Sequence, residues 1–241
     1  NPEDYTNRGR IITPLKDRYG AQIRTHYPRL LEQELDIVEQ EYVRFPDTAK
    51  RVEMPQYMKE VIGEITSLAR RSPEINQRSG VSLRVSIANY ETLIGNAFKR
   101  SLRQKEQSAP RISDLRAIVA STTGKIELES VEEGRELKVV EDLIRKAIVN
   151  VFGRYYSAGE FDQLTASFEG GLVIETGSDT PSADYVAKLP SMETMSEMIG
   201  RIEPSGEPAG VASAVEFVLE GLHLNRKLNK DLVEGQYVYR R

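Results

Sequence analysis

Apolar residues recur every three to four positions along most of this chain. That spacing is typical of helices that bury one face against a neighbour. Leu137, Val140, Ile144 and Val151 belong to the cleanest of these apolar stripes. The pattern predicts helices over about 29–44, 55–72, 81–104 and 113–119 in the first half, and over about 137–151, 161–168, 192–202 and 211–222 in the second half.

A different pattern occupies residues 21–27, where the two faces of the chain alternate. Ala21, Ile23, Thr25 and Tyr27 fall on one face, and polar residues fall on the other. Alternation with a period of two predicts a strand with one solvent-facing side. A short helix from Pro14 to Tyr19, ended by Gly20, is expected just before it.

Two stretches show neither the helical nor the strand periodicity and are expected to be connecting segments. Residues 121–134 resemble a linker, and residues 170–190 are rich in Gly, Ser, Thr and Pro, which predicts a loop. A second loop is expected over 203–208. Nearly everything after Pro28 is therefore expected to be helical, and the fold class is mainly α.

Composition narrows the function classes. The 241 residues include 33 Lys and Arg against 37 Asp and Glu, so the net charge is -4 and nucleic-acid binding is not expected. With 39% hydrophobic and 29% charged residues, the chain is typical of a soluble globular protein, and we expect it in the cytoplasm with no membrane contact. Cys is absent and only 2 His occur, at His26 and His223, so neither a metal site nor a His-based catalytic triad is expected.

The chain does not carry a phosphate loop of its own. Gly124-Lys125 has no Gly five residues before it, and Ile126 follows where Ser or Thr is needed. The acidic pair Glu141-Asp142 lies within the helical stripe of 137–151 and is read as a solvated turn. This chain alone is therefore not expected to hold a triphosphate and Mg²⁺.

The opening residues nevertheless carry a specific pattern. Asn1-Pro2-Glu3 is followed by the run Leu15-Lys16-Asp17-Arg18-Tyr19-Gly20 and then by the predicted strand. In order and spacing this segment resembles the magnesium chelatase I-subunit and MoxR branch of the AAA+ ATPases, with Tyr19 where that family has Phe. Because the chain opens inside the motif, we expect it to be a piece of a longer protein.

The resemblance implies three parts. Residues 1–28 would be the end of an AAA+ α/β core that contributes only its last edge strand, 29–120 a helical lid, and 121–241 a helical extension. It also implies site residues: Asn1 as the polar sensor, Arg18 as an arginine finger oriented by Asp17, and Arg84 as a second sensor that contacts the nucleotide from the lid. The cofactors would be ATP and Mg²⁺ in the intact protein.

The expected function is ATP binding and hydrolysis in a ring homo-oligomer, expected to be a hexamer, because a finger acts on a neighbour's nucleotide. Hydrolysis would drive remodelling of a protein substrate, or metal insertion with a partner, neither of which the sequence identifies. The isolated fragment is not expected to be catalytic. The alternative is a non-catalytic helical scaffold or protein-interaction module, and a nucleic-acid binder is a distant third.

Overall fold

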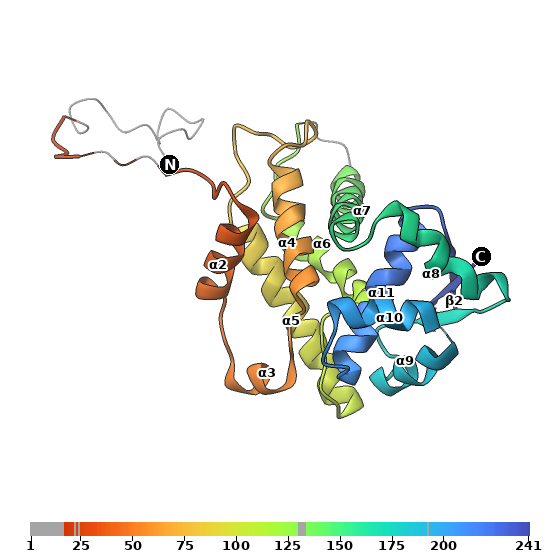
Figure 1. Ribbon diagram of the computed structural model, residues 1–241. Helices are drawn as coiled ribbons and strands as arrows, with labels where there is room; N and C mark the ends of the chain where they lie inside the picture. Colours follow the sequence, from red (N-terminus) through yellow and green to blue (C-terminus); the bar gives the residue numbers. More distant parts are fainter. Residues whose placement is uncertain (1–16, 22, 24, 130–133, 192) are drawn as a thin grey trace.

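Helices form at each long apolar stripe, and the mainly α prediction is confirmed. The computed structural model describes residues 17–21, 23, 25–129, 134–191 and 193–241 (Figure 1). In chain order the described elements are α2 (Leu31–Glu41), α3 (Pro46–Arg51), α4 (Gln56–Ala69), α5 (Arg84–Gln104), the 3-10 helix η1 (Ile112–Ala117), α6 (Ile118–Thr123), α7 (Arg135–Tyr155), η2 (Ala158–Glu160), α8 (Phe161–Glu169), β1 (Ile174–Thr176), α9 (Ser182–Lys188), η3 (Leu189–Ser191), α10 (Glu193–Ile202), α11 (Pro208–Leu224), β2 (Asn229–Val233) and β3 (Gln236–Arg240).

Helix α11 lies in the middle of the core. Every residue from Ala209 to Leu222 is buried, and the helix packs against α7, α9 and α10 (Figure 1). The rings of Tyr57 in α4 and Phe217 in α11 stack with their centroids 4.6 Å apart. A Cβ at Gly221 would lie only 2.3 Å from the Phe152 ring, so α7 and α11 approach this closely because that position has no side chain.

The boundary expected at residue 120 does not separate two cores. One continuous set of buried apolar side chains extends from Val38 to Tyr239. Helix α4 from the expected lid packs directly on α7 from the expected extension. The segments 29–120 and 121–241 are therefore joined through a shared hydrophobic interior.

The prediction of a loop over 170–190 is wrong in part. The segment contains strand β1 and helix α9, separated by a turn at Gly177 to Thr180. Tyr185 of α9 is buried against the core, which stabilises this short helix although its intrinsic helix signal is weak. Gly170 and Gly171 form a turn before β1, and a second turn from Gly177 to Thr180 follows it.

The expectation that nearly everything after Pro28 is helical is also wrong at the C-terminus. Strands β2 and β3 form a hairpin, and β1 pairs with β3 to give an antiparallel sheet in the order β1-β3-β2. The hairpin turns at Glu234 and Gly235, whose φ angles are 50° and 84°. Two successive positive φ angles match the right-handed twist of the flanking strands.

The strand expected over 21–27 is not observed among the described residues of that segment, which have no regular secondary structure. Ile23, on the face that was expected to be covered, is 90% exposed. A single strand without a partner has nowhere to place its backbone hydrogen bonds. The helix expected over 14–19 lies partly outside the described residues, and Asp17 and Arg18 form a turn.

Among the described residues, the structure has no helix with both the length and the apolar character needed to cross a bilayer.

Candidate functional site

The site residues expected from the sequence occupy different places. Asn1 lies outside the described residues. Asp17 and Arg18 are exposed in a turn on the segment that extends away from the helices (Figure 1). Arg84 is exposed in the first turn of α5. The structure of this chain therefore does not bring Arg18 and Arg84 together, and within the described residues neither arginine forms an ion pair.

The end of the N-terminal segment is fixed to the loop that leads into α5. The backbone N–H of Val81 donates a hydrogen bond to the Tyr27 hydroxyl oxygen over 3.0 Å. The Arg70 guanidinium lies 4.2 Å from the centre of the Tyr27 ring, and its Nε donates to the Val81 carbonyl over 3.1 Å. Tyr27 is thereby held against Val81, which lies three residues before the start of α5 at Arg84.

A buried carboxylate holds Arg70 in place for its contact with Tyr27. Glu34 in α2 is 3% exposed and accepts from Arg70 Nη1 over 2.5 Å and from the Ser86 hydroxyl over 2.6 Å. Arg70 follows the last turn of α4, and Ser86 lies in the first turn of α5. We call Tyr27, Glu34, Arg70, Val81 and Ser86 the junction cluster, because it joins the N-terminal segment to α2, α4 and α5.

The contact between Val81 and Tyr27 in the junction cluster requires glycine at position 80. Its φ angle is 70°, in the left-handed region that strongly favours glycine. A Cβ at this position would lie 2.5 Å from the Tyr27 hydroxyl oxygen. The backbone just before Val81 can therefore reach Tyr27 only with glycine at this position.

The sequence offered one signal for the junction cluster that the apolar stripes did not capture. Glu34 lies three residues after Leu31 and four before Val38, on the apolar face of the predicted helix. A carboxylate at such a position needs a buried partner. The partner, Arg70, comes from another helix, and the sequence alone does not identify it.

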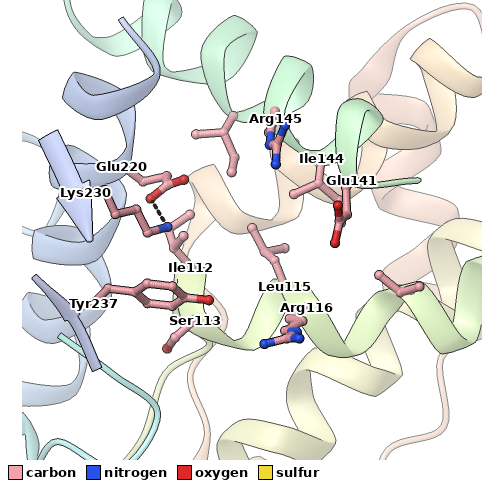
Figure 2. A pocket seen from close by; sticks show the side chains of 12 residues that line it. Ile112, Ser113, Leu115, Arg116, Glu141, Ile144, Arg145, Glu220, Lys230 and Tyr237 are labelled. Atoms are coloured by element: carbon pink, nitrogen blue, oxygen red, sulfur yellow. Dashed lines mark hydrogen bonds and ion pairs between the residues drawn. The ribbon is translucent and has the colours of Figure 1, made fainter. Parts of the chain in front are cut away.

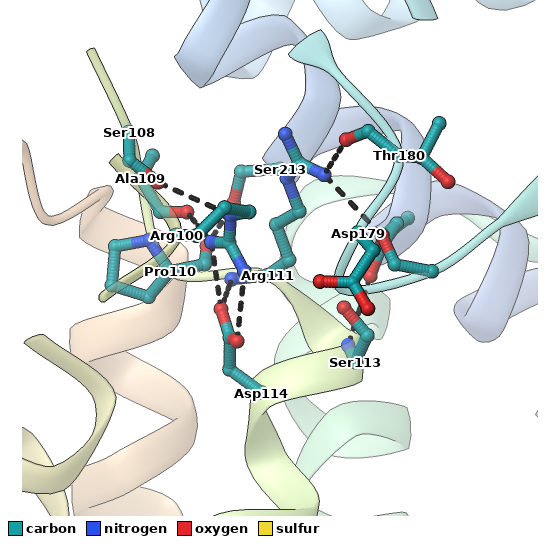
Figure 3. A network of polar contacts seen from close by, with 12 residues as sticks. Arg100, Ser108, Ala109, Pro110, Arg111, Ser113, Asp114, Asp179, Thr180 and Ser213 are labelled. Carbon is teal, nitrogen blue, oxygen red and sulfur yellow. Dashed lines mark hydrogen bonds and ion pairs between the residues drawn. The ribbon is translucent and has the colours of Figure 1, made fainter. Parts of the chain in front are cut away.

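A second buried network holds the turn after β1 (Figure 3). Arg100 of α5 forms a two-pronged ion pair with Asp114, with both nitrogen–oxygen distances at 2.8 Å, and also donates to the Ala109 carbonyl. Burial by itself lowers the pKa of Arg100, but the hydrogen bonds and charge of Asp114 outweigh it, so this pKa lies above its usual value. Arg100 is therefore permanently charged and fully committed to its neighbours.

Arg111, which is also fully buried, extends this network toward β1 and α9. It donates to the Thr180 carbonyl over 2.7 Å and to the Ser182 hydroxyl over 2.8 Å, and its guanidinium lies 4.9 Å from the centre of the Tyr185 ring. Only its Nε lacks a hydrogen-bond partner among the described residues. The role that these contacts support is structural: they fasten the loop before η1 to the turn between β1 and α9.

The polar side chains of α11 also have hydrogen-bond partners inside the protein. Tyr57 donates to Ser213 over 2.8 Å, Tyr185 donates to Glu216 over 2.6 Å, and Tyr239 donates to Glu220 over 2.5 Å. Burial raises the pKa of each of these three phenols far above its usual value. The carboxylates of Glu216 and Glu220 raise the pKa of Tyr185 and Tyr239 further.

The fit to ATP and Mg²⁺ is partial. Arg18 and Arg84 present guanidinium groups of the kind that bind phosphate oxygens. No three Asp, Glu or His side chains gather as a metal site in the part of the chain that the structure describes. The described residues therefore supply two separate exposed arginines, and Mg²⁺ would need carboxylate or hydroxyl ligands from elsewhere.

No family model, curated protein or solved structure matches the chain.

Proposed function

We propose that this chain is the C-terminal part of an AAA+ ATPase similar to the magnesium chelatase I-subunit and MoxR branch, working as a cytoplasmic ring, expected to be a hexamer. The observation that carries the proposal is the opening motif, Asn1-Pro2-Glu3 followed by Leu15 to Gly20, together with an exposed Arg84 at the start of the third long helix. An arginine held at the surface without an ion pair is available to a phosphate. The chain would use ATP and Mg²⁺ only within the intact protein.

In this proposal Arg18 acts on the nucleotide of the neighbouring subunit. Phosphoryl transfer needs neutralisation of charge at the γ-phosphate, and a finger of this kind is worth about 10³–10⁵ in rate, or about 4–7 kcal/mol of the barrier. Asp17 would orient the finger or the subunit contact, and Asn1 would position the attacking water or contact the γ-phosphate. An exposed Arg18 on a segment that extends from the helices is consistent with a role between subunits.

Arg84 would report the phosphate state of the nucleotide to the helices. The junction cluster supports this, since Tyr27 at the end of the N-terminal segment bonds directly to Val81, three residues before Arg84. A shift of the N-terminal segment would therefore be transmitted to the first turn of α5. The helices would pass the motion on to a protein substrate or a metal-inserting partner.

The test is nucleotide binding by the full-length gene product that contains this chain. Arg84→Ala should weaken binding of ATP by about tenfold or more, because it removes a charge-assisted hydrogen bond to phosphate. Lys99→Ala is the matched control, as Lys99 is an exposed cation in the C-terminal half of the same helix. Equal affinity for ATP in the Arg84 variant and the parent would overturn the sensor role.

The second candidate is a non-catalytic helical scaffold. It is favoured by the absence of a phosphate loop from these 241 residues and by internal pairing of the buried charges described above. The gene sequence upstream of Asn1 separates the two. A phosphate loop and an acidic strand end within about 200 residues support the ATPase, and their absence from the whole gene supports the scaffold.

A further inference from the structure

A pocket of about 190 Å³ shares no lining residue with the junction cluster (Figure 2). Its walls come from η1 and α6 on one side, α7 on another, and α11 with the hairpin β2–β3 on the third. Segments far apart in the sequence therefore converge on it. This convergence makes the pocket a property of the complete fold and not of one local loop.

One wall of the pocket is aliphatic. It is formed by the side chains of Ile112, Leu115, Val119, Ile144 and Ile148. An apolar cavity of about 150 Å³ is enough to hold a six-membered carbon ring, so the space here suits an apolar body of that size. A ligand that buries only apolar surface would, however, leave the charged side of the pocket without a role.

The charged floor of the pocket is already neutralised. Lys230 lies 2.6 Å from Glu220 Oε2, and its ammonium lies 4.0 Å from the centre of the Tyr237 ring. Glu220 also accepts a hydrogen bond from Tyr239. At the rim, Arg145 lies 3.6 Å from Asp142. These groups have partners within the protein and do not by themselves demand a ligand.

Arg116 and Glu141 differ from these groups. Both line the pocket, and Figure 2 shows Arg116 and Glu141 across the pocket from Lys230 and Tyr237. Among the described residues neither side chain has a hydrogen bond or an ion pair, with each other or with a third group. The mouth of the pocket thus carries one unpaired positive group and one unpaired negative group beside an aliphatic wall.

We propose that this pocket binds a small zwitterion with an apolar body, of the class of the aliphatic α-amino acids. The carboxylate of the ligand would pair with Arg116, its ammonium with Glu141, and its side chain would lie on the aliphatic wall. A simple organic anion would satisfy Arg116 but be repelled by Glu141, and a simple amine would meet the opposite conflict. The proposal does not depend on the ATPase function.

Isothermal titration of the 241-residue chain with L-leucine is the direct test. Binding in the micromolar to millimolar range is expected, in keeping with a ligand of few atoms. Isocaproate lacks the amino group of leucine, and isoamylamine lacks its carboxylate. Each should bind about tenfold more weakly or worse, because a charged group in the pocket is then left unpaired.

Variants locate the site. Arg116→Gln and Glu141→Gln should each weaken leucine binding by about tenfold, and Val119→Phe should abolish it by filling the space. Lys146→Gln is the control, because Lys146 is an exposed residue of α7 outside the pocket. Circular dichroism confirms that each variant is folded. Failure of leucine to bind at millimolar concentration, equal binding of isocaproate, or equal affinity in the Arg116 and Glu141 variants would each overturn the proposal.

Discussion

The interior around α11 and the separate surface positions of Arg18 and Arg84 use polar groups in opposite ways. In the interior, Glu216 and Glu220 accept hydrogen bonds from buried tyrosines. At the surface, Arg18 and Arg84 are exposed and, within the described residues, form no ion pair. The two regions of one chain therefore separate charge that stabilises the fold from charge that remains available to an outside group.

This difference separates residues that stabilise the fold from residues that are available for function. A buried charge must be paired to be tolerated, so its presence in the core says little about catalysis. An exposed arginine without an ion pair contributes little to stability. Substitutions in the two regions should consequently separate cleanly into effects on folding and effects on activity.

The largest effect on the free energy of unfolding is expected at alkaline pH, because the interior contains buried tyrosines. The folded protein keeps the phenols of Tyr57, Tyr185 and Tyr239 protonated, whereas the unfolded chain loses these protons near the ordinary pKa of 10.0. The free energy of unfolding should therefore be unaffected by these groups below that pH and should fall steadily as pH rises above it.

Phenolate absorbance and circular dichroism, followed together through this titration, provide the measurement. We expect phenolate from these three buried tyrosines to appear only as helical structure is lost. The double variant Tyr185→Phe and Tyr239→Phe should move the alkaline transition to higher pH. Ionisation of the buried tyrosines in a fully helical protein would contradict the account of the interior.

The next largest effect is expected from the buried arginine of the second network. Arg100→Met leaves Asp114 buried without its ion-pair partner, which should lower the free energy of unfolding by about 3–5 kcal/mol. Arg103→Met, one turn away on α5, removes an exposed pair with Asp179 and should change it by about 0–1 kcal/mol. Urea denaturation of the two variants measures the contrast, and equal losses would remove the distinction between buried and exposed charge.

Smaller effects are expected at the junction cluster. Gly80→Ala forces a side chain into the left-handed region and against Tyr27, so it should destabilise the fold by about 1–2 kcal/mol. Gly95→Ala, in the middle of α5 with open space around it, should instead stabilise the protein by about 0.5–1 kcal/mol. Thermal unfolding of both variants measures the sign of each change in stability. Stabilisation by Gly80→Ala would mean that Tyr27 does not contact Gly80 as described.

The sequence predicted the long helices because their apolar stripes act within one segment. Helix α7 is observed where Leu137 to Val151 predicted it, with a few more residues at each end. The hairpin of Asn229–Val233 and Gln236–Arg240 was missed, although Glu234-Gly235 is a recognisable turn pair. Its strands are short, and β3 also pairs with β1, which lies more than fifty positions earlier in the chain.

The candidate site was predictable only in part, for the same physical reason. Arg84 could be placed at the start of a helix from its own neighbourhood, and it lies there. The bond from Val81 to Tyr27 and the pairing of Glu34 with Arg70 join segments that only the folded chain brings together. The roles of Asn1, Asp17, Arg18 and Arg84 at a nucleotide stay predictions.

ATP hydrolysis by the Arg18→Ala variant of the full-length gene product tests the central claim most directly. The account predicts that hydrolysis falls by about 10³-fold or more while nucleotide binding persists and the free energy of unfolding changes by less than about 0.5 kcal/mol. Arg29→Ala, an exposed arginine at the end of the same segment, should hydrolyse ATP at the parental rate. Hydrolysis at the parental rate by the Arg18 variant would contradict the claim that this arginine reaches a neighbour's nucleotide.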